Sequence, residues 1–481
     1  MAVTVPCARA LYRPAAVGLL MLWVGGAAVA QAPAAAPQTP NAYFEFLMAR
    51  RLEAQGDQAG ALAALERAAA ADPASAEVKA EIASFQLRRN RRTDAESAAL
   101  EALRLNDANL EAHRVLGLIY AANVDAMNAR TPRSQVEAAA RQAIAHLERV
   151  AGEAAAGTDI QIYYSLGGLY LRTGEPAKAV DAFIRVVDQN PTSAQGRLSL
   201  AQAYAASDNI KSAVATLEII VDDEPRVAST LAQYQEQAGL LKDAAQSYTR
   251  ALAVEPTSRA LKFRRIATVF NDRNYAQAAA FAAEAQAQHP DDLRFPRLRA
   301  RAVFEGGDPA RALTILEPTA KAYPKDAATQ FALSDLYNDS GRDGDAERTL
   351  RQYLEVEPAS AEALNSLGYL LADRGRALDE AVRLVERALV ADPGNPSYLD
   401  SLGWAHFRRG DLNEAEKYLL PAAEQLPRNA VVQDHLGDIR AGQGRWIDAI
   451  AAWTRALAGD GGIDRAVVEK KVQDARSKIP R

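Results

Sequence analysis

Residues 361–404 read AEALNSLGYLLADRGRALDEAVRLVERALVADPGNPSYLDSLGW, and they contain two copies of a Ser-Leu-Gly-aromatic motif. The first copy ends at Tyr369 and the second at Trp404. Between them, Gly375 interrupts one helix-forming run and Pro393 ends a second. Glycine suits the left-handed residue that ends a helix, and proline cannot continue one. The stretch therefore predicts two helices, a tight turn between them, and a loop before the next unit.

The same punctuation recurs along most of the chain. Prolines follow one another at intervals of 34, 31, 34, 34, 34, 35 and 34 residues, at Pro191, Pro225, Pro256, Pro290, Pro324, Pro358, Pro393 and Pro427. An alanine stands twelve residues before each of them, at Ala179, Ala213, Ala244, Ala278, Ala312, Ala346, Ala381 and Ala415. The phase extends forward to Ala449 and back to Ala95 and Ala61. A fixed period of this length indicates a repeat architecture.

Each repeated position has a packing role. A small residue at the position of Gly368 lets the first helix approach the second, and the alanine at the position of Ala381 does the same from the other side. Larger residues are expected to fill the space between neighbouring units, namely Phe183, Leu217, Tyr248, Leu316, Leu350, Leu419 and Trp453. A single helix pair cannot bury its apolar face alone, so the units must stack.

The period, the Leu-Gly pairs and the turn glycines resemble the tetratricopeptide repeat, which implies an all-α, right-handed solenoid. We expect about twelve helix-turn-helix repeats over residues 41–462, with units beginning near residues 42, 76, 110, 160, 194, 225, 259, 293, 327, 361, 396 and 430. Residues 463–481 are expected to form a C-terminal capping helix and tail. The third unit has about sixteen extra residues, with a loop expected near 125–134, and the 31-residue interval shortens the first helix of the sixth unit.

The first forty residues differ from the repeats. Arg9 and Arg13 precede a mostly apolar run, and Ala28-Val29-Ala30 is typical of a signal peptidase site before Gln31. We predict a cleaved signal peptide at 1–30 and a Pro/Ala linker at 31–40; an uncleaved anchor is the alternative. The one cysteine, Cys7, precedes the apolar run, so no lipid attachment site follows it. These features predict a periplasmic or otherwise exported chain with no membrane span after signal removal.

Composition and motifs argue against catalysis and nucleic-acid binding. Without residues 1–30 the chain has 54 basic side chains (56 less two arginines) against 61 acidic ones, which disfavours nucleic acid as a partner. None of the five histidines has a metal-ligand spacing, and no nucleophile elbow, P-loop or dinucleotide motif occurs. We therefore expect no catalytic residues, no metal and no cofactor.

The exposed positions of the first helices are the predicted partner-binding residues. Positions 2, 5, 9 and 12 of a unit share one helical face, which lines the concave groove in arrays of this family. In the later repeats these predicted residues are Phe263, Phe270, Arg294, Arg297, Arg301, Phe304, Phe331, Asp335, Asn338, Asn365, Tyr369, Asp400, Trp404 and Phe407. Rings would take apolar side chains, amides the peptide backbone, and arginines a carboxylate. For Tyr369 and Trp404, packing between units is an equal alternative.

A narrower resemblance covers about residues 361–457. The motifs around Tyr369 and Trp404 resemble the C-terminal repeats of proteobacterial envelope proteins of this repeat class, including an outer-membrane lipoprotein adaptor that partners a carboxyl-terminal processing protease. The resemblance implies a non-catalytic scaffold or adaptor that binds other proteins or extended peptides, with a periplasmic protease or cell-wall enzyme as the implied partner. The alternative is a structural component of an envelope polysaccharide-export or assembly complex.

Overall fold

The computed structural model describes residues 41–152 and 159–479, and its regular elements are all helices. In this part of the chain the helices form twelve consecutive pairs followed by one single helix. The predicted all-α solenoid with a capping helix is therefore confirmed. The predicted signal peptide and linker, at 1–30 and 31–40, lie outside the described residues. Within the described residues, no helix is both long enough and apolar enough to cross a membrane.

The first helices of the pairs are α1 (Ala42–Ala54), α3 (Ala76–Arg88), α5 (Leu110–Asp125), α7 (Ile160–Thr173), α9 (Ala194–Ala206), α11 (Ala228–Gln237), α13 (Arg259–Asn271), α15 (Arg294–Glu305), α17 (Ala327–Asp339), α19 (Ala361–Asp373), α21 (Pro396–Arg409) and α23 (Ala430–Gly442). The second helices are α2 (Gln58–Ala71), α4 (Arg92–Leu105), α6 (Arg133–Ala151), α8 (Pro176–Gln189), α10 (Ile210–Glu218), α12 (Leu241–Val254), α14 (Tyr275–Gln288), α16 (Pro309–Ala322), α18 (Asp343–Val356), α20 (Leu378–Ala391), α22 (Leu412–Gln425) and α24 (Trp446–Ala458). The last helix is α25 (Arg465–Ser477).

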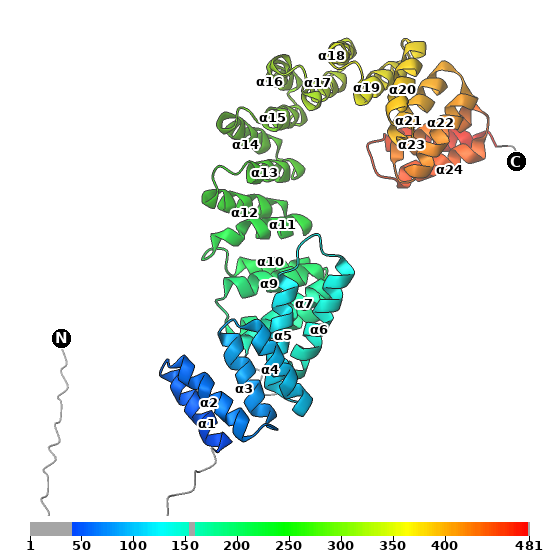
Figure 1. Ribbon diagram of the computed structural model, residues 1–481. Coiled ribbons are helices and arrows are strands. Elements are labelled where there is room, and N and C mark those ends of the chain that lie inside the picture. Colours follow the sequence, from blue (N-terminus) through cyan, green and yellow to red (C-terminus); the bar gives the residue numbers. More distant parts are fainter. Residues whose placement is uncertain (1–40, 153–158, 480–481) are drawn as a thin grey trace, which may run out of the picture. The chain divides into compact units, whose positions relative to one another are not determined.

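The chain forms two compact units that divide inside α5, between Ile119 and Tyr120. In the second unit the pairs follow one another in file, and α25 packs on the last pair (Figure 1). Val468, Val472 and Ala475 of α25 are buried against Trp453 of α24. This contact covers the apolar face that the last pair would otherwise expose.

The repeated alanine of the second helices is the tightest packed position. Its side chain has no exposed surface at any of its occurrences, which are Ala61, Ala95, Ala179, Ala213, Ala244, Ala278, Ala312, Ala346, Ala381, Ala415 and Ala449. The larger residues expected between units are also buried, each 3% exposed or less, as Phe183, Leu217, Tyr248, Leu316, Leu350, Leu419 and Trp453. The small and the large residues of the repeat are buried as predicted, but Phe183, Leu419 and Trp453 face the glycine of the first helix in their own unit.

Loop residues set both ends of the first helices. The side chain two residues after a loop proline caps the next helix in several units: Ser258, Asp326 and Ser360 each accept a hydrogen bond from a backbone N–H of the first turn. At the other end, the turn glycines adopt φ angles between 64° and 94°, at Gly174, Gly239, Gly307, Gly341, Gly375, Gly410 and Gly444. Asn90, Asp208 and Arg273 take this left-handed conformation where glycine is absent.

The third and sixth units are irregular close to the positions that the sequence predicted. The loop of the third unit runs over 126–132, within the predicted segment. The 31-residue interval shortens two helices, not one: α11 has 10 residues after the short 3₁₀ helix η2 (Pro225–Val227), and α10 ends early with 9 residues. The chain after Glu218 combines β-branched Ile219, Ile220 and Val221 with three acidic residues, and both features disfavour the C-terminal end of a helix.

Adding a methyl group at the close approach of one pair should destabilise the chain. A Cβ atom on Gly403 would lie 2.7 Å from Cβ of Leu419 and 2.9 Å from the carbonyl oxygen of Ala415. We expect Gly403→Ala to lower the free energy of unfolding by about 1–3 kcal/mol. Gly394→Ala is the matched control, because no atom lies within 4 Å of the added group. Urea denaturation followed by circular dichroism measures both, and equal midpoints for the two variants would contradict the packing account.

Candidate functional site

Two adjoining hollows lie along the first helices of the second unit, and they collect most of the predicted residues. The aromatic–arginine hollow has a volume of about 440 Å³ and is lined by Phe263, Arg294, Arg297, Arg301, Phe331, Asp335 and Glu362, among others. The acid–amide cavity has a volume of about 420 Å³ and is lined by Asp335, Asn338, Asn365, Tyr369, Asp373 and Asp400, among others. Asp335 lines both, so the hollows form one continuous surface from α13 to α23.

The arginines of the aromatic–arginine hollow are paired with carboxylates of the chain itself. Arg294 lies 2.6 Å from Asp292, and this contact holds the pKa of Asp292 below its ordinary value. Arg297 bridges to the next unit, 2.7 Å from the Asp326 carboxylate that also caps α17. Arg301 contacts Asp339 at 2.8 Å. A carboxylate of a partner would therefore compete with internal ones.

Aromatic rings supply the open apolar surface of this hollow. Phe263 and Phe331 are half-buried and line it. The guanidinium of Arg294 lies over the ring of Phe263, 5.5 Å from its centroid. Because the neighbouring arginine stems and rings lie together, the hollow offers a mixed apolar and polar contact for an extended chain.

The acid–amide cavity is rich in hydrogen-bond acceptors. Asp335 is exposed at the surface, yet desolvation of its carboxyl group raises its pKa, with a smaller contribution from Asp339. Asp400 is 7% exposed, and one oxygen is held 2.9 Å from Nδ1 of His435. Tyr369 is half-buried, and burial together with Asp373 and Asp400 raises its pKa to about 12. Its phenol is therefore neutral at physiological pH.

Four predicted residues line neither hollow. Trp404 is 8% exposed and stacks between His435 and Phe407, at centroid distances of 4.0 and 5.1 Å. Phe270 packs edge-on against Tyr275, and Phe304 packs on the core of the units from α15 onward. For Tyr369 and Trp404, a place in the groove and packing between units were equal alternatives. The structure buries Trp404 between units, whereas Tyr369 lines the cavity. Direct contact of these four residues with a partner stays a prediction.

The cavity also contains residues that the choice of four positions per unit missed. Asp373 lies one turn after Tyr369, at the thirteenth position of its unit. Asn429 caps α23 and lines the cavity, as a loop residue outside the helical register. Sequence features mark both residues. Asp373 lies four residues after Tyr369 and so on the same helical face, and Asn429 follows Pro427 by two residues, as a helix cap does in other units.

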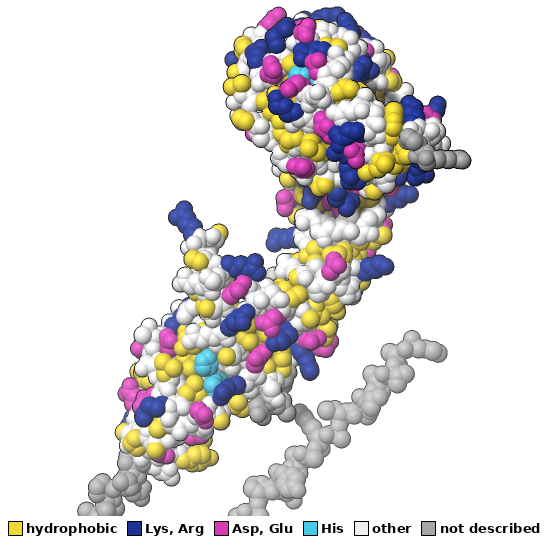
Figure 2. Space-filling view, turned by 90° about the vertical axis from the view of Figure 1, so that its right-hand side faces the viewer, with side chains coloured by type: hydrophobic (Ala, Val, Ile, Leu, Met, Phe, Trp, Pro, Cys, Tyr) yellow, Lys and Arg dark blue, Asp and Glu magenta, His cyan; other side chains and the backbone are white. Residues whose placement is uncertain are grey.

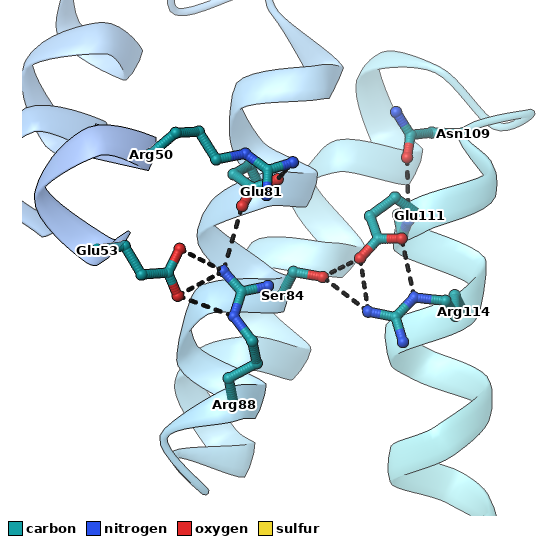
Figure 3. Close-up of polar contacts among 9 residues, drawn as sticks. Arg50, Glu53, Glu81, Ser84, Arg88, Asn109, Glu111 and Arg114 are labelled. Atoms are coloured by element: carbon teal, nitrogen blue, oxygen red, sulfur yellow. Dashed lines mark hydrogen bonds and ion pairs between the residues drawn. The ribbon is translucent and has the colours of Figure 1, made fainter. Parts of the chain in front are cut away.

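The equivalent face of the first compact unit is closed by ion pairs. Figure 3 shows Arg88 of α3 between Glu53 of α1, at 2.9 Å, and Glu81, at 3.2 Å. On α5, Arg114 contacts Glu111 at 2.8 Å. The charged side chains of these first helices therefore pair with one another, either within a helix or between successive first helices.

The described residues contain no candidate metal site, and the face drawn in Figure 2 carries charges of both signs. No group of three or more histidine, cysteine or carboxylate side chains within residues 41–152 and 159–479 is placed to hold a metal ion. On the face drawn in Figure 2, Lys and Arg side chains are interspersed with Asp and Glu. Interspersed charges of both signs do not form the basic stripe that a nucleic-acid backbone needs.

Comparison with known proteins identifies the repeat type. Two family profiles, both described as tetratricopeptide repeat, match residues 170–234 and residues 297–347, 339–396 and 378–430. A TPR repeat-containing protein of Pseudomonas aeruginosa is 33% identical over 156 residues, which is 32% of this chain and 26% of that protein. The chain thus spans about a quarter of the length of this relative.

A tetratricopeptide repeat protein from Parabacteroides merdae aligns with 52% of this chain and 97% of its own, at 18% identity and a TM-score of 0.43.

Truncation of Trp404 should cost stability, in keeping with its place in packing. We expect Trp404→Ala to lower the free energy of unfolding by about 3–5 kcal/mol, because it opens a cavity between α21 and α23. Trp404→Phe should cost less, since it keeps a stacked ring and removes a buried Nε1–H without a partner. Val390→Ala, at an 83% exposed site, is the control. A loss for Trp404→Ala no larger than that of the control would contradict this placement.

Proposed function

Because the chain is a tetratricopeptide repeat protein, we propose that it is a non-catalytic scaffold that binds an extended segment of another protein along its first helices. The observation that carries this proposal is the continuous surface from α13 to α23. It places half-buried aromatic rings beside acceptors such as Asn365 and Asp335, and stacking leaves this surface open. Rings and fixed polar groups together are the composition of a peptide-binding groove.

We further propose that the scaffold works in the bacterial envelope. The support is the basic, apolar and small-residue order of residues 1–30, which is typical of exported proteins. The narrower resemblance over 361–457 adds an envelope protease or cell-wall enzyme as the proposed partner. The matched relative comes from a bacterium, Pseudomonas aeruginosa, and its name gives no binding partner.

Site-specific photocrosslinking in intact bacterial cells tests both parts of the proposal. Benzoylphenylalanine in place of Phe331 sits in the aromatic–arginine hollow, and in place of Val390 it sits on an exposed second helix. We expect position 331 to give discrete adducts with envelope proteins and position 390 to give few, because only the first lies in the proposed groove. The adducts should be released with the periplasmic fraction, on a chain that begins at Gln31.

Two results would contradict the proposal in different ways. Equal adducts from positions 331 and 390 would refute the groove. Adducts that stay with the cytoplasmic fraction, on a chain that keeps residues 1–30, would refute the exported location and leave the groove intact.

A further inference from the structure

The lining of the acid–amide cavity carries an excess of negative charge. Three carboxylates line it, those of Asp335, Asp373 and Asp400, and no lysine or arginine is among its lining residues. It draws these side chains from α17, α19 and α21, so the charge is assembled only by stacking of successive units. Its volume of about 420 Å³ is within the usual range of ligand pockets, about 300–1,000 Å³.

One acceptor of the cavity is left without a donor. Asn365 lines the cavity, and its Oδ1 atom is buried and has no hydrogen-bond partner. The Asp335 carboxyl group is exposed, and its pKa stays above the ordinary value although the charge of Arg301 lowers it. A buried acceptor without a donor costs free energy, and a ligand that brings several N–H donors recovers it.

The two arginines beside the cavity already have partners within the chain. Arg374 lies 3.1 Å from Asp343 and 3.7 Å from Asp373, and it donates to Asn338 at 2.9 Å. Arg408 donates to the backbone carbonyl of Asp373 and lies over the ring of Trp404. Burial, Asp373 and Asp400 raise the pKa of Tyr369 to about 12, although Arg374 and Arg408 act in the opposite direction.

The walls of the cavity suit a long aliphatic stem. Leu350, Leu370 and Val432 are buried residues on its lining, and the half-buried Tyr369 adds a ring. A lysine or arginine side chain buries its methylene groups on such surfaces while its head keeps polar partners. An aromatic ring beside the head adds a cation–π contact.

We propose that the acid–amide cavity holds a lysine or arginine side chain of an extended protein segment. The ammonium or guanidinium group donates to Asp335, Asp373 and the free oxygen of Asp400, and Asn365 accepts a further hydrogen bond. The partner is thus a basic segment, because the arginines of the adjoining hollow are already paired with Asp292, Asp326 and Asp339. This inference rests on the proposed scaffold function and specifies the chemistry of its partner.

Binding of defined peptides to the mature chain tests the proposal. The probe is a fluorescein-labelled, amidated octapeptide of alternating lysine and serine, and its counterparts carry norleucine or glutamate in place of lysine. Fluorescence anisotropy should show binding of the lysine peptide alone, weakening as sodium chloride is raised. Asp335→Asn and Asp373→Asn should each weaken it by about fivefold. Asp222→Asn, at a side chain 84% exposed outside the cavity, is the charge-matched control and should bind as the unmodified chain does.

Each contrary outcome has a distinct meaning. Equal binding of the glutamate peptide, or an unchanged affinity of Asp335→Asn with unchanged helicity, would overturn the cavity assignment. Displacement of the lysine peptide by an equal concentration of spermidine would show a site for free polyamines and would also overturn it. Adducts from position 331 that persist under any of these results would show that the scaffold function stands without the cation site.

Discussion

Close contact between the two helices of each pair determines how successive pairs can stack. A Cβ atom on Gly368 would lie 2.5 Å from Cγ2 of Val385 and 3.0 Å from the carbonyl oxygen of Ala381. At the same position of an earlier unit, a Cβ atom on Gly167 would lie 2.5 Å from the ring of Phe183. The alanines opposite have no exposed surface. Most pairs have a small residue at this point, although α13 has Ile266 there. Because the contact recurs from pair to pair, each pair presents its neighbour with a similar apolar face, and the pairs stack in file.

Stacking also decides which charges are available to a partner. Salt bridges between neighbouring first helices, such as Arg88 with Glu53 and Arg297 with Asp326, neutralise much of the face that each compact unit presents. The cavity between α17 and α23 differs because no lysine or arginine is among its lining residues, although Asp400 contacts His435 of the next unit. A repeat array can therefore form a local binding site when the residue types at equivalent positions differ between units, while the arrangement of the helices stays the same.

The sequence predicts the repeat and its packing because both follow from spacing. The period of the prolines and alanines located the helix pairs, and the turn glycines located the left-handed residues. The early end of α10 was not predicted. The repeat was aligned on single alanines and prolines, and this alignment takes no account of the run Ile219–Val221 and the acidic residues after it. The caps of several first helices were not predicted, although each is a Ser, Asp or Asn two residues after a proline, as at Ser258, Asp326 and Ser360.

The sequence predicted which face of the first helices forms the candidate site, but not which side chains on that face contact one another. Tyr369 and Trp404 occupy the same position of successive units, yet Tyr369 lines a cavity while Trp404 is stacked on His435 of the following unit. Likewise, nothing in the spacing of Arg297 shows that Asp326, 29 residues later, neutralises it. Such outcomes depend on side-chain directions across a unit boundary, which one sequence does not specify.

Hydrogen exchange of the mature chain carrying Gly368→Ala tests whether close contact within a pair sustains the stack, because the substitution forces α19 away from α20. We expect faster exchange in α19 and α20, a smaller effect in α17, α18, α21 and α22, and unchanged exchange in α11 to α14. Uniform loss of protection along the second compact unit, or none in α19 and α20, would contradict this role of the contact.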